Sequence, residues 1–197
     1  MKPATFDYHR PASVDEALAL LEAHAGDAKP LAGGQSLIPA MNFRLATPAI
    51  LVDLNALGEL AYVRRGDDGL RIGAMTRHRT MERHADVAQL APLVTEAMPW
   101  IAHAAIRTRG TIGGSLAHAD PAAELPAVML ALDARFTLRS RAQSRTVPAT
   151  DFFTGLFTTA TEPGELLTEV GVIQRFVRTQ HPRRGLLREQ LDLADRR

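Results

Sequence analysis

The stretch RTRGTIGGSLAHADPAAELP, at residues 107–126, decides how this chain is interpreted. It sets Gly113-Gly114 beside a hydroxyl residue and ahead of a predicted helix. A partly similar stretch, KPLAGGQSLIP at residues 29–39, likewise places Gly33-Gly34 near a hydroxyl residue and ahead of a predicted helix. Glycine has no Cβ and tolerates positive φ angles, so a pair between strand and helix indicates backbone that must approach something closely. The two stretches therefore raise the question of what approaches them.

The overall composition is that of an ordinary globular protein. The 197 residues are 46% hydrophobic and 23% charged, and the formal net charge is +1. This length accommodates one large domain or two small ones that share a core. A balanced charge gives no indication of nucleic-acid or membrane binding, and no apolar run reaches the roughly 20 residues that span a bilayer. The N-terminus shows no secretory pattern, so we expect a cytoplasmic protein.

The chain contains no cysteine, and its seven histidines form no HExxH-like ligand pair. Thiolate nucleophiles, iron–sulfur ligation and cysteine-based zinc sites are thereby excluded for this chain. We expect no metal site built by this chain alone. If the protein takes part in redox chemistry, an organic cofactor must carry the electrons.

Residues 1–57 carry an alternating helix and strand pattern. SVDE at residues 13–16 is a capping box, and apolar residues follow it at helical spacing. An α/β pattern is completed by a short apolar, strand-like stretch at 29–32, a short helix capped by Ser36 and a buried strand at 49–54. These signals predict a small first domain that ends near residue 57.

The pattern changes after Leu60. Strands at 60–65 and 70–74 are joined by Asp67-Asp68-Gly69, a typical hairpin turn. Helices are then predicted at about residues 80–84, 89–98 and 121–132, and further strands at about residues 135–139 and 166–172. We expect a second domain over residues 58–172, so the fold class is α/β (α+β).

Residues 32–36 are named the first glycine segment and residues 111–115 the second glycine segment. We interpret both as loops whose N–H groups and hydroxyls converge on a diphosphate. Neither matches GxGxxG, and GxxxxGK[ST] is absent, so the dinucleotide fingerprint and the P-loop are unsupported. A tight turn or a helix C-cap is the structural alternative for either pair, and the residues alone leave it open.

Several residues beside these segments have both a functional and a structural interpretation. His118 and Asp120 could serve acid–base chemistry, but Asp120-Pro121 also reads as a helix N-cap with proline at N1, which we favour. For the others we favour structural roles: a hydrogen-bonded, partly buried His103, a Trp100 in the core, and solvated or structural Arg107 and Arg109. Their functional alternatives are, in turn, contact with a ligand, stacking on an aromatic ligand and attraction of a phosphate.

Two long stretches resemble a known family. Residues 29–57, KPLAGGQSLIPAMNFRLATPAILVDLNAL, and residues 106–134, IRTRGTIGGSLAHADPAAELPAVMLALDA, are similar to signature segments of the FAD-binding medium subunit of molybdenum hydroxylases. This is the flavoprotein family of carbon monoxide dehydrogenase and xanthine dehydrogenase. The likeness runs from about Phe6 to Val170. It implies the two-lobed FAD-binding fold of the vanillyl-alcohol-oxidase/PCMH type: a small N-terminal α/β lobe, then a larger lobe with an antiparallel sheet and helices.

The resemblance also implies which residues bind FAD. The two glycine segments would hold the diphosphate and its neighbouring ribose and ribityl groups. Acidic contacts would come from the stretch after the second segment, and apolar residues would line the flavin. The implied cofactor-binding residues are Ala32, Gly33, Gly34, Gln35, Ser36, Ile101, Thr111, Ile112, Gly113, Gly114, Ser115, Asp120, Glu124 and Leu167.

In such complexes a molybdopterin-binding large subunit oxidises the substrate, and a small subunit holds two [2Fe–2S] clusters. The resemblance therefore implies an oxidoreductase subunit that takes electrons from the partner's clusters and passes them to an external acceptor. No residue of this chain is assigned a catalytic role. Two alternatives stay open: a self-sufficient FAD oxidoreductase of the same broad fold, and a binding-only remnant without flavin.

The likeness ends near Val170. Residues 173–197 hold seven arginines against three acidic residues, a net charge of +4. We cannot match them to the C-terminal domain with which the family continues, and we expect a truncated or frameshifted member. A basic tail is typical of a solvated helix or a disordered end, although Leu187, Leu191 and Ala194 could form one apolar stripe.

Overall fold

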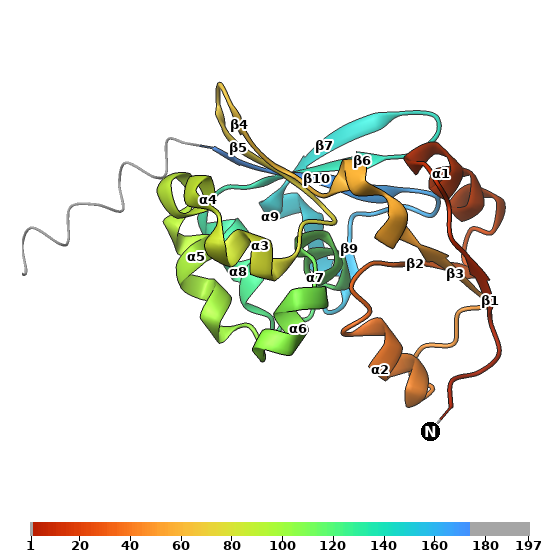
Figure 1. Cartoon of the computed structure of the whole chain (residues 1–197). Helices are drawn as coiled ribbons and strands as arrows, with labels where there is room; N and C mark the ends of the chain where they lie inside the picture. The colour runs from red at the N-terminus through yellow and green to blue at the C-terminus, as the bar shows by residue number, and fades with distance from the viewer. Residues whose placement is uncertain (1, 174–197) are drawn as a thin grey trace, which may run out of the picture.

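The computed structural model describes residues 2–173, which form a three-stranded sheet, a five-stranded sheet and a two-stranded β8-β9 ribbon, with helices packed against them (Figure 1). The features predicted for residues 174–197 lie outside the described residues. The strands are β1 (Asp7–His9), β2 (Ala28–Leu31), β3 (Ile50–Asp53), β4 (Val63–Gly66), β5 (Gly69–Gly73), β6 (Arg135–Arg139), β7 (Ser144–Pro148), β8 (Phe153–Gly155), β9 (Thr158–Thr159) and β10 (Leu166–Ile173). The α-helices are α1 (Val14–Ala23), α2 (Leu37–Asn42), α3 (His78–Arg83), α4 (Ala85–Leu90), α5 (Pro92–Ala97), α6 (Ala104–Arg109), α7 (Ile112–His118), α8 (Glu124–Ala131) and α9 (Ala149–Phe152). The 3-10 turns are η1 (Leu54–Ala56), η2 (Gly58–Leu60) and η3 (Met98–Trp100).

The first sheet is small and parallel, with the strand order β1-β3-β2. Helix α1 packs against it and begins as its sequence predicts, because the Ser13 hydroxyl accepts a hydrogen bond from the N–H of Glu16 at 3.2 Å. The apolar stripe of α1 is buried together with Ile50 and Val52 of β3. Strand β1 has no counterpart in the predicted pattern, because its three residues are mostly exposed and show no apolar run.

The second sheet is antiparallel and has the order β4-β5-β10-β6-β7. Its central strand, β10, is the last strand of residues 2–173 and pairs with both β5 and β6. Helices cover one face of this sheet, as Figure 1 shows, and the main hydrophobic core lies between them. A second core joins the lobes, because Met75 and Leu166 of the larger lobe pack with the residues of α1 and β3.

Several helices differ from the predicted pattern. The helix expected at 89–98 is divided into α4, α5 and η3, since Pro92 cannot continue the hydrogen bonds of α4 and instead begins α5. Neither α6 nor α7 is expected from propensity, because both are short and α7 contains Gly113-Gly114. Tertiary packing overrides propensity in such short elements. None of the helices between residues 2 and 173 is long and apolar enough to cross a bilayer.

The aromatic cluster under α9 gives a direct test of the larger core. Phe136 is fully buried, and its ring centroid lies 4.3 Å from that of Phe152 and 5.7 Å from that of Phe153. We expect Phe136→Ala to lower the free energy of unfolding by about 3–5 kcal/mol in a urea titration. Leu45→Ala, at a side chain that is 83% exposed, serves as the control and should change it by less than about 0.5 kcal/mol. Equal stability of the two variants would contradict this packing.

Candidate functional site

The two glycine segments, which come from different lobes, lie against each other. A Cβ placed on Gly33 would be 2.4 Å from the carbonyl oxygen of Arg109 and 2.8 Å from the Cα of Gly110. A Cβ on Gly114 would be 3.3 Å from the Cβ of Ala32. The segments therefore form one continuous surface at the seam between the lobes.

The first glycine segment is a turn between β2 and α2. Gly34 adopts φ +71°, a conformation that side chains disfavour, and the side chain of Gln35 donates to the carbonyl of Gly33 at 2.9 Å. Within residues 2–173, the N–H groups of Gly34, Gln35 and Ser36 have no hydrogen-bond acceptor. The segment can therefore offer successive N–H donors to an anion. The predicted side-chain cap at Ser36 is wrong, because Ser36 precedes α2 with its side chain uninvolved.

The second glycine segment is the start of a helix, which corrects the expectation of a loop. Thr111 is the N-cap of α7, and its hydroxyl accepts a hydrogen bond from the N–H of Gly114 at 3.1 Å. The N–H groups of Ile112 and Gly113 donate to the carbonyls of Thr76 and Ala74, at 3.0 and 2.8 Å. Most backbone donors of this segment are thus used within the protein, and hydroxyls are what it can offer a ligand.

The glycines mainly serve close packing of the protein on itself. A Cβ on Gly113 would lie 2.5 Å from the Cβ of Ala74 and 2.8 Å from its carbonyl oxygen. Real Cβ atoms do not approach other atoms so closely, so α7 can rest on the end of β5 only with glycine at this position. For Gly33 and Gly113, the close approach is to backbone of this chain, which corrects the reason inferred from sequence. Gly34 is the position where glycine is needed for its conformation.

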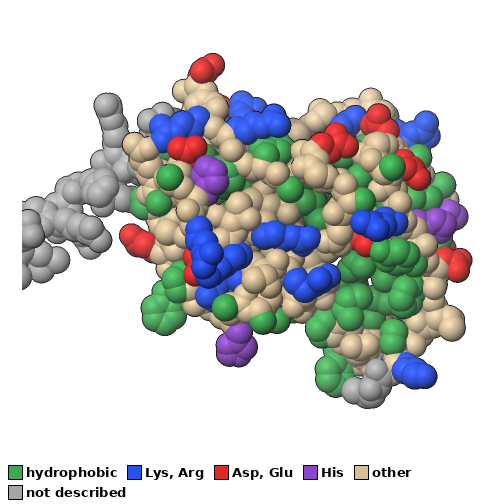
Figure 2. All heavy atoms as spheres, viewed as in Figure 1, with side chains coloured by type: hydrophobic (Ala, Val, Ile, Leu, Met, Phe, Trp, Pro, Cys, Tyr) green, Lys and Arg blue, Asp and Glu red, His purple; other side chains and the backbone are tan. Residues whose placement is uncertain are grey.

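Positive charge surrounds the paired segments. Figure 2 shows basic side chains gathered over α3 and α6 at the centre of one face. Arg77 directly precedes α3 and Arg109 ends α6. Burial, followed by the nearby charge of Arg109, lowers the pKa of Arg77. An arginine remains protonated through such a shift. Two guanidinium groups next to unbonded N–H donors favour an anionic ligand.

Arg107 has a structural role, as the sequence interpretation favoured. It is buried beneath the turn before α6, where its Nη1 donates to the carbonyls of Ile101 and Ala102 at 3.1 and 3.0 Å. An ion pair of 3.4 Å joins it to Glu82. These contacts support a strained turn, since Ala102 adopts φ +45°.

The remaining predicted site residues are spread around the second segment. The side chains of Ile101 and Leu167 are buried in the larger core, so their contact with flavin stays a prediction. Glu124 is the first residue of α8. Asp120 does not cap that helix, because its Oδ1 accepts from the N–H of Ala122 at 2.9 Å and so closes a turn before α8. The N-cap of α8 is Ala123.

Two further expectations are wrong. Trp100 is 78% exposed and is no part of the core, because η3 ends at this residue with its buried side at Met98. His103 is exposed at the start of α6, where a partly buried position was expected. His118 packs against the ring of Phe157, with 5.2 Å between the centroids. No sequence pattern singles out Asn55 or Arg77. Asn55 bonds to Ala32 of the first segment, and Arg77 bonds to Asn55 across the seam and to Arg109, two residues before the second segment.

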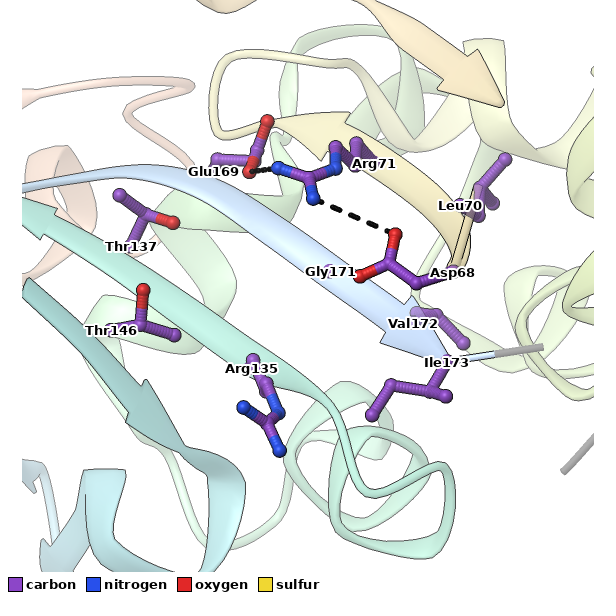
Figure 3. Close-up of a pocket in the computed structure, with 10 residues that line it drawn as sticks. All are labelled: Asp68, Leu70, Arg71, Arg135, Thr137, Thr146, Glu169, Gly171, Val172 and Ile173. Atoms are coloured by element: carbon purple, nitrogen blue, oxygen red, sulfur yellow. Dashed lines mark hydrogen bonds and ion pairs between the residues drawn. The ribbon is translucent and has the colours of Figure 1, made fainter. Parts of the chain in front are cut away.

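A hollow also lies away from the glycine segments. It has a volume of about 190 Å3 on the outer face of the five-stranded sheet, and Figure 3 shows the side chains that line it. Arg71 spans it with ion pairs of 3.5 Å to Asp68 and to Glu169, so its charge is neutralised within the protein. None of the predicted site residues lines this hollow, and we place the site at the glycine segments. Unbonded N–H groups, hydroxyls and two arginines there fit the diphosphate of FAD.

The packing of Gly33 predicts the effect of the smallest side chain. We expect Gly33→Ala to lower the free energy of unfolding by about 1–3 kcal/mol, because the new methyl group collides with the peptide of Arg109. Gly58→Ala is the matched control, since a Cβ there meets no atom within 4 Å. Urea titrations of both variants measure the difference. A Gly33→Ala protein as stable as the control would contradict the close contact of the segments.

His78 predicts a dependence of stability on pH. It is buried beneath Gly110 with both ring nitrogens unbonded, and burial lowers its pKa to about 4. The Thr111 backbone opposes part of this shift, but no hydrogen bond of normal geometry joins it to the imidazole. The unfolded chain binds a proton near pH 6.5 and the folded chain only near pH 4, so stability falls as the pH is lowered between these values.

We therefore expect wild type to lose about 2 kcal/mol more than His78→Leu between pH 7.5 and pH 5. Urea titrations at the two pH values measure this difference. Parallel pH profiles of the two proteins would show that His78 is solvated or hydrogen-bonded.

Comparisons with known proteins agree with this geometry. The family described as "FAD binding domain in molybdopterin dehydrogenase" matches residues 4–172. The 6-hydroxypseudooxynicotine dehydrogenase complex subunit alpha of Paenarthrobacter nicotinovorans is 49% identical over 88% of this chain and 59% of that protein. The carbon monoxide dehydrogenase medium chain of Afipia carboxidovorans is 45% identical over 87% of this chain and 60% of that protein. A crystal structure of cyanide-inactivated Cu,Mo-CO dehydrogenase superposes with a TM-score of 0.87 at 44% identity, covering 88% of this chain and 61% of that one.

The chain thus spans about 60% of the length of the relatives that it matches. The matches confirm the predicted mixed α/β architecture of the PCMH type and the predicted family. This chain belongs to the FAD-binding domain family of molybdopterin dehydrogenases, and FAD is the cofactor of that family.

Proposed function

We propose that this chain is the FAD-binding, electron-transferring part of a molybdenum hydroxylase. The observation that carries the proposal is the pairing of the two glycine segments, with unbonded N–H donors on one side and arginines beside them. The family match over residues 4–172 supports the same cofactor. The domain limits 1–57, 58–172 and 173–197 are part of this proposal, as is a cytoplasmic location.

The residues of this chain would bind and orient the cofactor. The N–H groups of Gly34, Gln35 and Ser36 would donate to the diphosphate, and Arg77 and Arg109 would provide the compensating positive field. The hydroxyls of the second glycine segment and the carboxylate of Glu124 would hold the sugar groups. Bound FAD would supply the redox chemistry, accepting electrons and releasing them to an acceptor. No proton transfer by a side chain is assigned.

The electrons would come from a partner. We propose a small subunit with [2Fe–2S] clusters as the donor and a molybdopterin-binding large subunit as the site of substrate oxidation. The names of the relatives, a dehydrogenase complex subunit and a medium chain, support assembly into a hetero-oligomer. The substrate would then be determined by the large subunit, not by this chain.

The visible spectrum of the desalted chain tests FAD binding. We expect flavin absorption at about 450 nm, with an intensity that corresponds to one FAD per chain. Gly34→Val should lose the flavin, because a β-branched residue disfavours the φ of +71° that aligns the N–H groups. Gly58→Val, at an open position with no atom within 4 Å of an added Cβ, is the matched control and should keep it.

Reduction kinetics then separate the functions. Rapid reduction of the bound flavin by a reduced [2Fe–2S] partner supports the proposal. Direct reduction by a small alcohol or an enolpyruvyl sugar nucleotide would indicate a self-sufficient oxidoreductase instead. Partner binding by a folded chain that takes up no FAD would indicate a binding-only role.

A further inference from the structure

One guanidinium group connects the two lobes beside the glycine segments. Arg77 lies between β5 and α3, and its Nη1 donates to the carbonyl of Arg109, the same oxygen that faces Gly33. Its Nη2 donates to the Oδ1 of Asn55 at 2.6 Å, across the seam. The planar guanidinium thus holds one contact on each side, an arrangement that a single ammonium group cannot reproduce.

Asn55 carries this contact to the first glycine segment. Its Nδ2 donates to the carbonyl of Ala32, the first residue of that segment, at 2.9 Å. The backbone N–H of Asn55 donates to the Oδ1 of Asp53 at 2.9 Å, and its Nδ2 contacts the same oxygen. The side chain of Asn55 is therefore oriented from both ends, with its carbonyl oxygen toward Arg77.

Asp53 anchors the chain of contacts in the small sheet. It ends β3, and its Oδ2 accepts a hydrogen bond from the hydroxyl of Tyr8 in β1. Burial acts to raise the pKa of Asp53, but hydrogen bonds from Tyr8 and Asn55 outweigh it and leave that pKa lowered. The carboxylate is thus ionised near neutral pH. Polar contacts run without a gap from the first strand to Arg109, two residues before the second glycine segment.

We propose that Arg77 and Asn55 form a clasp that holds the two glycine segments at the separation needed for FAD. The inference rests on the proposed binding of FAD between these segments. Arg77 acts here as a positioning residue, because its two terminal nitrogens donate to protein oxygens on the two sides of the seam. Its charge still contributes to the positive field beside the segments. A hollow of about 130 Å3, lined by Asn55 and Arg77, adjoins the clasp. On that side, no packed side chains of residues 2–173 are present to hold the segments in place of these hydrogen bonds.

The test compares Arg77→Lys and Asn55→Ala with wild type and a matched control. Arg65→Gln is the control, because Arg65 also joins two elements, β4 and α4, through a 2.6 Å contact with Asp86, but neither element carries a glycine segment. Hydrogen exchange is measured first, on the flavin-free chains. We expect the N–H groups of His78, Ile112 and Gly113 to exchange faster in both clasp variants, because their hydrogen bonds hold the second segment and the adjoining Gly110 in place. Those of β10 should be unchanged.

FAD affinity is measured next, by titration of flavin fluorescence. We expect each clasp variant to bind about tenfold more weakly than wild type, which corresponds to about 1.4 kcal/mol. The double variant should bind little more weakly than either single variant, because both substitutions break the same connection. Arg65→Gln should match wild type in exchange and in affinity.

The outcomes separate the two proposals. A folded wild-type chain that binds no FAD overturns the proposed function. If wild type binds FAD and Arg77→Lys binds it as tightly as Arg65→Gln does, the clasp alone is overturned. Unchanged exchange of the segment N–H groups in the clasp variants overturns the clasp whether or not FAD binds.

Discussion

The contact between Gly33 and the Arg109–Gly110 peptide is the constraint on which this site depends. No side chain fits between the two backbones, because a Cβ on Gly33 would lie 2.4 Å from a carbonyl oxygen. Another contact of this kind, Gly113 on Ala74, fixes the start of α7 against the end of β5. Together they bring segments of two lobes into one surface, which a ligand as long as FAD can span.

Two kinds of interaction keep the lobes together around that surface. The smaller hydrophobic core includes Met75 and Leu166 of the larger lobe, so the lobes share apolar burial as well as a seam. Beside it runs the polar chain from Tyr8 through Asn55 to Arg77. Apolar burial is non-directional and can hold the lobes close, whereas the hydrogen bonds specify their relative position. A cofactor held by both lobes requires both effects.

The site could be predicted from sequence in part. The two segments, their glycines and the hydroxyls beside them are local features, and the resemblance of residues 29–57 and 106–134 indicated the family that the comparisons confirm. The difference between the segments was not accessible in this way. Whether an N–H group is unbonded, as at Gln35, or occupied, as at Gly113, depends on partners that lie far away in the chain.

Local signals also failed at the edges of elements. Asp120-Pro121 matches the sequence pattern of a helix N-cap followed by proline at N1. The helix nevertheless begins at Glu124, because Asp120 closes a separate turn first. Trp100 is a large aromatic residue of the type expected in a core, but it lies on the surface. The predicted helix is interrupted there, and the short η3 buries Met98 instead. Burial of a single side chain depends on the direction of a short element, which composition does not specify.

The sequence by itself determined the fold class, the family and the two segments of the candidate site. The fold class and the segments follow from patterns of adjacent residues: the capping box of α1, the hairpin at Asp67-Asp68-Gly69 and the paired glycines. The family follows from the resemblance of residues 29–57 and 106–134. Only the tertiary structure decided what those glycines face and which residues tie them together. Gly33 meets Arg109, and Asn55 meets Arg77, because the return of β10 to the centre of the sheet and the shared core bring distant residues into contact. Such contacts depend on the packing of whole elements, and the spacing of residues along the chain does not encode them locally.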